Sequence, residues 1–66
     1  MHIIVNDQST EVPPDSTIAA LLTQLNLPAT RSAVERNRNL VRRSDHATTV
    51  LAEGDRLEIV TLVGGG

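Results

Sequence analysis

A single segment of this 66-residue chain has the apolar spacing of an amphipathic helix. Its large apolar residues fall at i, i+3, i+4 and i+7, on one helix face. They are Ile18, Leu21, Leu22 and Leu25. Asp15 or Ser16 is expected to cap the start, and Asn26 and Pro28 suit the end. Because a helix buries one such stripe against another element, the rest of the chain has to supply a sheet with a matching apolar face.

The segments around the helix are typical of strands and turns. A hairpin is expected from residues 1–5 and 9–12 around the turn at Asn6, and Pro13-Pro14 ends it. Later segments are two short strands, one helical turn capped by Ser44, and a long last strand; they cover residues 33–36, 40–41, 44–48 and 56–63. This order predicts an α+β fold, a mixed sheet of four to five strands with one main helix packed on one face.

Composition excludes several classes of function. The chain has no cysteine, so it offers no disulfide, no thiolate metal site and no cysteine nucleophile. It has no aromatic residue on which bases could stack, and its net charge of −2 also argues against nucleic acid. No apolar run is long enough to span a membrane, and the N-terminus lacks a signal-peptide pattern. We therefore expect a soluble, cytoplasmic protein without membrane or nucleic-acid partners.

Basic residues gather in one part of the chain. All six are arginines, and residues 31–43 hold five of them with Glu35, a net charge of +4. The segments before and after carry −3 each. Residues 36–43 are expected to form a local basic patch, which is either a solvated face or a docking surface.

The side chains inside the sequence do not form a recognisable catalytic or metal site. His2 and His46 lack ligand spacing and are expected at the surface. The serines lack a nucleophile-elbow context. Most carboxylates fall at turns or outward strand positions and are expected to be solvated; they are Asp7, Glu11, Asp15, Asp45, Glu53, Asp55 and Glu58. We predict no catalytic side chain and no bound metal.

The last strand predicts both a core face and an exposed apolar patch. Leu57 and Ile59 share one face, and Val60 and Leu62 share the other. Ile4 has the same outward parity in the first strand. If the two strands are neighbours, Ile4, Val60 and Leu62 form an exposed partner-binding patch; isolated exposed aliphatic residues are the alternative. The expected core consists of Ile3, Val5, Leu21, Leu22, Leu25, Leu57 and Ile59.

Three glycines, Gly64, Gly65 and Gly66, close the chain directly after this strand. Glycine has no Cβ, so such a stalk can thread a narrow channel and present the α-carboxylate of Gly66 to another protein's active site. A frayed end or a linker is the alternative. With Gly66 taken as the natural end, we predict a folded domain over residues 1–63 and a flexible tail over 64–66 whose carboxylate reacts.

The chain resembles the ubiquitin-like β-grasp sulfur carriers, and in particular the ThiS family of thiamine-biosynthesis sulfur carriers. The matching features span the whole chain, and only the last is chemically specific. They are residues 1–6, the helix at 17–25, Val34-Glu35-Arg36-Asn37 followed by Leu40-Val41, Glu53-Gly54-Asp55, and the terminal Gly65-Gly66. The family often has proline where Arg42 stands, a departure that leaves the tail unchanged.

This resemblance implies a specific chemistry. An E1-like adenylyltransferase of the ThiF type would use ATP to adenylate the Gly66 carboxylate, with Gly64 and Gly65 threaded through its active site. A sulfur donor protein would convert the adenylate to a thiocarboxylate, and a thiazole synthase of the ThiG type would accept the sulfur. The carrier would be a protein co-substrate rather than an enzyme, and it would bind no cofactor itself.

Other functions remain open from the sequence. The chain could carry sulfur to another acceptor, of the molybdopterin or tRNA-thiolation type, or act as a ubiquitin-like modifier. The absence of lysine disfavours a lysine-linked polymer built on this chain. A non-covalent β-grasp interaction module with an inert tail is the remaining alternative.

Overall fold

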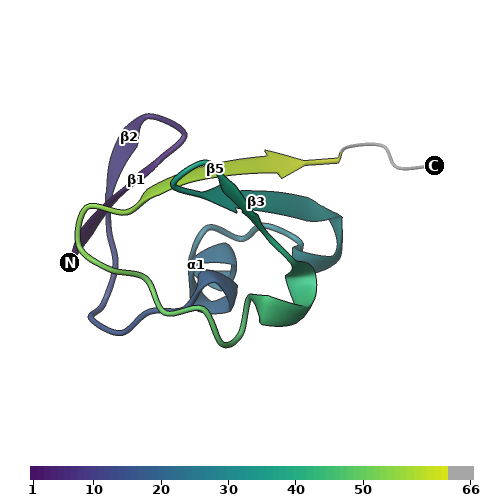
Figure 1. Ribbon diagram of the computed structural model, residues 1–66, viewed down its shortest axis with the longest axis horizontal. Helices are drawn as coiled ribbons and strands as arrows, with labels where there is room; N and C mark the ends of the chain where they lie inside the picture. The colour runs from purple at the N-terminus through teal and green to yellow at the C-terminus, as the bar shows by residue number, and fades with distance from the viewer. Residues whose placement is uncertain (63–66) are drawn as a thin grey trace.

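The computed structural model describes residues 1–62, which form a five-stranded mixed sheet with one α-helix packed on one face (Figure 1). The elements are β1 (His2–Val5), β2 (Gln8–Glu11), α1 (Ile18–Gln24), the 3₁₀ turn η1 (Ala29–Arg31), β3 (Ser32–Arg36), β4 (Asn39–Val41), the 3₁₀ turn η2 (Arg43–Asp45) and β5 (Arg56–Thr61). The strand order is β2-β1-β5-β3-β4, so the last strand lies at the centre of the sheet. The predicted α+β class and element order are confirmed.

Two tight hairpins build the outer parts of the sheet. Each has a two-residue loop in which both residues have positive φ: Asn6 (49°) and Asp7 (67°) between β1 and β2, and Asn37 (50°) and Arg38 (72°) between β3 and β4. Such loops match the right-handed twist of the flanking strands, and asparagine tolerates this conformation better than most residues. Asparagine thus takes the place that glycine often fills.

Helix α1 begins at a different cap from the one the sequence suggests. The Thr17 hydroxyl accepts a hydrogen bond from the Ala20 backbone N–H at 3.1 Å. Asp15 has a φ of 63° in the preceding turn, and the Ser16 hydroxyl donates to the Pro13 carbonyl at 2.6 Å. The prediction of Asp15 or Ser16 as the cap was wrong, because both residues belong to the turn that delivers the chain to Thr17.

The end of α1 follows the prediction. Asn26 has a φ of 58°, its N–H donates to the Thr23 carbonyl at 3.1 Å, and the Leu27 N–H donates to the Leu22 carbonyl at 2.9 Å. These two bonds are the Schellman pattern that satisfies the last carbonyls of a helix.

The second 3₁₀ turn also corrects an expectation. Element η2 covers Arg43–Asp45 and follows Arg42, with no side-chain capping bond. Ser44 therefore lies inside the turn, and the prediction that it caps a helical turn over residues 44–48 was wrong.

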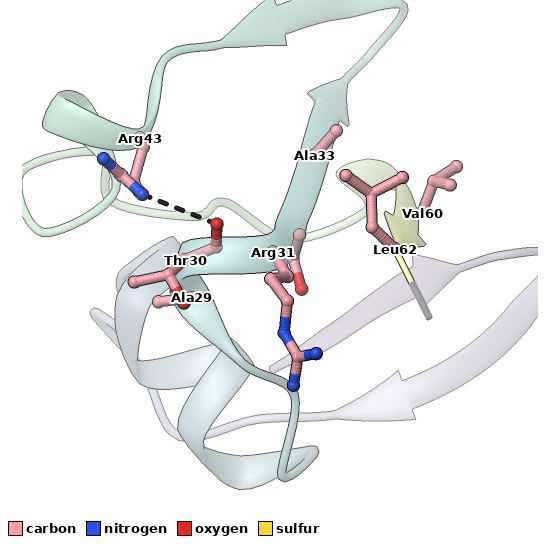
Figure 2. Close-up of a pocket in the computed structure, with 8 residues that line it drawn as sticks. Ala29, Thr30, Arg31, Ala33, Arg43, Val60 and Leu62 are labelled. Carbon is pink, nitrogen blue, oxygen red and sulfur yellow. Dashed lines mark hydrogen bonds between the residues drawn. The ribbon is translucent and has the colours of Figure 1, made fainter. Parts of the chain in front are cut away.

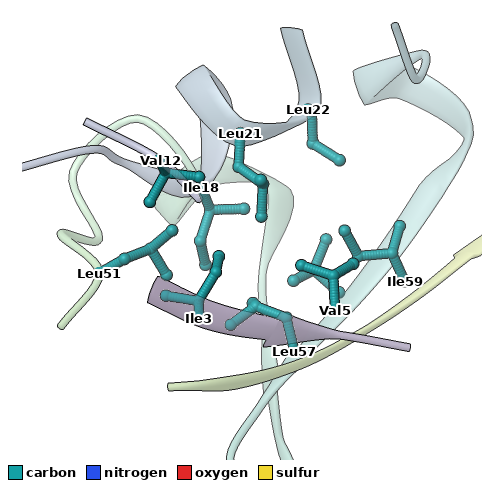
Figure 3. Close-up of a cluster of buried hydrophobic side chains, with 10 residues drawn as sticks. Ile3, Val5, Val12, Ile18, Leu21, Leu22, Leu51, Leu57 and Ile59 are labelled. Carbon is teal, nitrogen blue, oxygen red and sulfur yellow. The ribbon is translucent and has the colours of Figure 1, made fainter. Parts of the chain in front are cut away.

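The core lies between α1 and the inner face of the sheet (Figure 3). Its buried residues are Ile3, Val5, Val12, Ile18, Leu21, Leu22, Val34, Leu51, Leu57 and Ile59. Six of the seven residues expected there are buried, and Leu25 is only partly buried at the core's edge. With no aromatic residue, this aliphatic cluster provides the hydrophobic stabilisation, about 1.5–3 kcal/mol for each large side chain that is fully buried.

Strands β1 and β5 are parallel neighbours over a short stretch, with Ile4 opposite Arg56 and Val5 opposite Leu57. The side chain of Asn6 then extends this pairing. Its Nδ2 donates to the Ile59 carbonyl at 3.1 Å, and its Oδ1 accepts from the Ile59 N–H at 2.9 Å. The amide of Asn6 therefore acts as one further strand residue, at the point where the backbone of β1 turns away towards β2.

Candidate functional site

The predicted reacting residue Gly66 and the threading residues Gly64 and Gly65 lie outside the described residues. We therefore describe the surface around the end of β5, which precedes these residues in the chain. The Leu62 N–H donates to the Arg31 carbonyl at 2.9 Å, so this end of the chain is held beside the segment that enters β3. Antiparallel pairing between β3 and β5 continues from there, with Ser32 opposite Thr61 and Ala33 opposite Val60.

The two faces of β5 differ as the alternation predicts. Leu57 and Ile59 point into the core, whereas Val60 and Leu62 stand on the outer face with 62% and 67% of their surfaces exposed. A strand places successive side chains on opposite faces, so burying Leu57 and Ile59 exposes the other two. The expected exposure of Val60 and Leu62 is confirmed, and their role in partner binding stays a prediction.

Ile4 is also on the outer face, but it lies elsewhere along the sheet. Its side chain is half-buried, and its neighbour on β5 is Arg56. Glu58 separates that position from Val60 along the strand. The structure therefore brings Val60 and Leu62 together and leaves Ile4 apart from them.

An open hollow of about 410 Å³ lies on the outer face at the end of β5 (Figure 2). Its lining comes from η1, β3, η2 and β5, and consists of Ala29, Thr30, Arg31, Ser32, Ala33, Arg43, Val60 and Leu62. Figure 2 shows Arg43 on one side, with its Nη1 donating to the Thr30 carbonyl at 3.5 Å, and Val60 with Leu62 on the other side. We call this feature the β5-end hollow.

The charges around the β5-end hollow have one sign. Arg31 and Arg43 line it, and neither forms an ion pair with a carboxylate of residues 1–62. A second hollow of about 280 Å³, at the other end of the outer face, has mixed charges. It is lined by Asp7, Glu35, Arg38, Arg56 and Glu58. Arg56 there pairs with Asp7 at 3.0 Å.

Three of the four arginines of residues 36–43 lie apart from one another. Arg36 points to the inner side of the sheet and pairs with Asp55 at 2.8 Å. Arg38 lines the mixed hollow, and Arg43 lines the β5-end hollow together with Arg31, which lies outside the expected patch. Pairing of β3 with β5 separates these side chains, because it places the two ends of β3 at opposite ends of the sheet.

Asp55 was expected in solvent, and this prediction was wrong. It is buried and accepts hydrogen bonds from Arg36 Nε at 2.8 Å, from the Ala52 N–H at 2.8 Å and from Asn37 Nδ2 at 3.1 Å. Burial alone raises the pKa of this carboxyl, but the bonds from Ala52, Asn37 and Arg36 outweigh burial and hold its pKa below the ordinary value. These contacts connect β3 and the turn before β5, so Asp55 has a structural role.

The two histidines have different environments. His2 is exposed as expected, 3.9 Å from a carboxylate oxygen of Glu11. His46 was predicted at the surface, and this was wrong: only 4% of it is exposed, and its Nε2 lies 3.2 Å from the Val41 carbonyl. Its Nδ1 has no hydrogen-bond partner among the described residues.

Within residues 1–62, no three histidine, cysteine or acidic side chains are placed to hold a metal ion. The same residues contain no helix long and apolar enough to cross a bilayer.

Comparison with known proteins identifies the family. The family model described as "ThiS family" matches residues 2–66. The chain belongs to the ThiS family. The match includes the strands, the helix, the β5-end hollow and the three terminal glycines.

Individual relatives fall into two groups. The sulfur carrier protein ThiS of Escherichia coli is 29% identical over 66 residues, which is the full length of both chains. Thiazole synthases of Paramagnetospirillum magneticum and Magnetococcus marinus are 36% and 35% identical over 66 residues. This chain spans 20% of the length of each of these two proteins.

A solved structure agrees with the fold. The crystal structure of the thiamine biosynthesis protein ThiS from Geobacter metallireducens superposes with a TM-score of 0.84 at 28% identity, over the full length of both chains. The ThiS fold and the β-grasp arrangement predicted from the sequence are therefore confirmed.

Sequence reasoning found Val60 and Leu62 but not the basic side of the β5-end hollow. The alternation in β5 identifies the two apolar residues without knowledge of the neighbouring strands. Arg31 and Arg43 reach the hollow through η1, η2 and the pairing of β3 with β5. The excess of arginine over residues 31–43 was the available signal, and it could not say which arginines share a surface.

Proposed function

We propose that this chain is a sulfur carrier protein of thiamine biosynthesis and that the carboxylate of Gly66 is the group that reacts. The observation that carries the proposal is the ThiS family match over residues 2–66, which includes the terminal glycines. The full-length similarity to a protein named sulfur carrier protein ThiS supports it.

The first step activates a poor electrophile. In the proposed reaction an E1-like enzyme transfers AMP from ATP to the Gly66 carboxylate, which forms an acyl-adenylate and releases pyrophosphate. A hydrosulfide equivalent from a sulfur donor protein then attacks the acyl carbon and displaces AMP, leaving a thiocarboxylate. The chain has no cysteine, so the sulfur has to come from outside the chain.

The carrier contributes a rigid domain and a narrow tail. It acts as a co-substrate without catalytic side chains, binds no cofactor, and relies on the activating enzyme to use ATP. Gly64 and Gly65 let the tail pass a narrow active-site channel, because a Cβ at either position would make the tail wider. We also propose that the carrier acts in the cytoplasm, where ATP is available to the activating enzyme.

The proposed sulfur acceptor is a thiazole synthase. Two relatives named thiazole synthase contain a region similar to the whole of this chain, which supports a working connection between the two kinds of protein. The ThiF-type activating enzyme is proposed from the chemistry alone, since a free carboxylate requires activation before sulfur can be attached.

The test uses two changes to the tail. Residues appended after Gly66 move the carboxylate, and Gly65→Phe keeps the carboxylate but obstructs its approach, where errors of about 1 Å cost on the order of 10²-fold in rate. Both variants should lose ATP–pyrophosphate exchange with the host's activating enzyme and keep the parent melting temperature. Mass spectrometry of the parent from its host should find a fraction in which one sulfur replaces one oxygen. Full adenylation of the extended chain without trimming would refute the proposal.

A further inference from the structure

The outer edge of β4 presents backbone groups beside an exposed apolar side chain. The Asn37 N–H donates to the Arg56 carbonyl at 2.7 Å, so odd-numbered residues of this segment face β5 and even-numbered ones, such as Val34, face β4. Val34 pairs with Val41, and the next residue along β4, Leu40, therefore directs its N–H and C=O away from the sheet. The Leu40 side chain is 70% exposed. Such an edge is a template on which another strand can pair.

The edge of β2 has the same arrangement on the opposite side of the sheet. The Val12 N–H donates to the Met1 carbonyl at 2.9 Å, so even-numbered residues of β2 face β1, and Ser9 faces away. Ser9 is exposed. The Gln24 side chain donates to the Glu11 carbonyl at 3.0 Å and so occupies an outward carbonyl at the end of the strand. The open part of this edge is therefore short and is centred on Ser9.

The two edges carry charges of opposite sign. Residues 36–43, which include β4, contain four arginines and no acidic residue, whereas residues 7–11, which include β2, contain two acidic residues and no basic one. Neither Arg38 nor Arg42 forms an ion pair with a carboxylate of residues 1–62. Like charges oppose the pairing of β4 with β4 and of β2 with β2, and opposite charges favour the pairing of β4 with β2.

Strand directions and faces also fit a contact between β4 and β2 of two copies. β3 is antiparallel to β4 and β5, β5 is parallel to β1, and β1 is antiparallel to β2, so β4 and β2 run in opposite directions. Leu40 lies opposite Glu35, and Ser9 lies opposite Ile4, so both are on the outer face. A second copy displaced sideways, with its outer face on the same side, therefore brings its β2 antiparallel to β4 of the first.

We infer that the edge of β4 binds the edge of β2 of a second copy of this chain, head to tail, and so continues the sheet. Ser9 of the second copy then lies opposite Leu40 of the first. In the same register its Glu11 lies opposite Arg38, and its other edge carboxylate lies opposite Arg42. Because each copy uses two different edges, the contact does not close at a dimer, and further copies can add. The contact is short, so the association is weak and depends on concentration.

This inference goes beyond the proposed function and does not depend on it. β5 lies two strands from either edge of the sheet, so the contact leaves the end of β5 uncovered. A failed test of the tail chemistry therefore leaves the edge contact standing, and a failed test of the edge contact leaves the tail chemistry standing.

The test first asks whether the 66-residue chain associates and through which residues. Sedimentation equilibrium in about 0.05 M salt gives the mean mass over a dilution series, and amide NMR spectra of the same samples locate the contact. The mean mass should rise with concentration without a plateau at the dimer. The amide shifts that change on dilution should lie in residues 7–11 and 38–42. A monomer at every concentration up to about 1 mM, or shifts confined to other residues, would overturn the inference.

Charge reversals then test the register. Arg38→Glu and Glu11→Arg should each weaken self-association about fivefold or more, because each sets like charges opposite one another. An equal mixture of the two variants should recover the association of the parent, since each β4 then meets a β2 of opposite charge on the other variant. A mixture that associates no better than either variant alone would overturn the head-to-tail pairing.

The matched control is Glu58→Arg, which changes the net charge as Glu11→Arg does but lies at an exposed position of the central strand. It should change self-association less than about twofold, because salt screens a charge that is far from the contact. All three variants should keep the parent melting temperature. Equal effects of Glu58→Arg and Glu11→Arg would overturn the assignment of the contact to the edges of the sheet.

Discussion

Arg36 Nε donates to Asp55 Oδ2 at 2.8 Å, and this contact joins β3 to the turn that precedes β5. The other bonds to Asp55 come from the Ala52 N–H and the Asn37 side chain, so both carboxylate oxygens have partners inside the protein. Only 7% of Asp55 is exposed. These three donors, one of them a charged guanidinium, stabilise the ionised carboxylate in the interior.

The first prediction concerns acid stability. Because the folded state holds the pKa of Asp55 below its ordinary value of 3.8, the ionised carboxylate adds stability above that value and loses it as the pH falls through the lower, folded pKa. Asp55→Asn should lower the free energy of unfolding at neutral pH and flatten its decline in acid. Urea unfolding from pH 7 downward measures both. The control is Glu58→Gln, at an exposed position, and its free energy of unfolding should fall in acid as steeply as that of the parent. A decline in Asp55→Asn as steep as that of the parent would contradict the prediction.

The second prediction concerns the start of α1. Thr17→Ala removes the hydroxyl that accepts from the Ala20 N–H and should cost about 0.5–2 kcal/mol of stability. Hydrogen exchange at the Ala20 amide should become faster. Thr17→Ser keeps the hydroxyl and should stay close to the parent. An unprotected Ala20 amide in the parent would argue against this cap.

The third prediction concerns the core. Leu22→Ala or Ile59→Ala should lower the free energy of unfolding by about 2–5 kcal/mol, because each leaves a cavity under α1. That cost approaches the whole stability of many small domains, about 5–15 kcal/mol. Val60→Ala, on the opposite face of β5, should change it by less than about 0.5 kcal/mol. If Ile59→Ala melts at the same temperature as the parent, the assignment of the two faces is wrong.

The fourth prediction concerns the Asn6 side chain. Asn6→Gly keeps the positive φ of the loop and removes both side-chain bonds to Ile59, so exchange of the Ile59 amide should accelerate. The matched control is Asp7→Gly, in the same loop, which removes only an exposed pair with Arg56. Equal protection of Ile59 in the two variants would show that the amide does not extend the strand.

Local pattern predicted most of the fold. The stripe from Ile18 to Leu25 located the helix, Asn26 located its end, and alternation in β5 separated Leu57 and Ile59 from Val60 and Leu62. Each of these inferences depends on neighbours within a few residues, where helix and strand periods act directly. Thr17 was not predicted as the helix cap, although its capping bond is local. Three possible capping residues, Asp15, Ser16 and Thr17, are consecutive, and the turn before the helix decides which of them caps it.

The misplaced residues depend on partners that are far away in the sequence. Asp55 is buried because Arg36 and Asn37 meet it from 18 or 19 residues away, across the sheet. Arg31 joins Leu62 through the antiparallel pairing of β3 with β5. His46 is buried where the segment after β4 meets α1, and its backbone carbonyl accepts a hydrogen bond from the Ala19 N–H at 3.0 Å. A single sequence gives residue types and periods, but it does not say which strands lie side by side.

The parallel pairing of β1 with β5 has a mechanical consequence. A partner that pulls on the segment after Leu62, against a domain held at β1, pulls β5 lengthwise past its neighbour. The bonds from Ile4 to Asp55, from Asn6 to Leu57 and from the Asn6 side chain to Ile59 then carry the load together. Peeling two strands apart would break such bonds one after another, whereas sliding has to break them at once. The sheet is therefore expected to resist traction along the direction in which β5 leaves it.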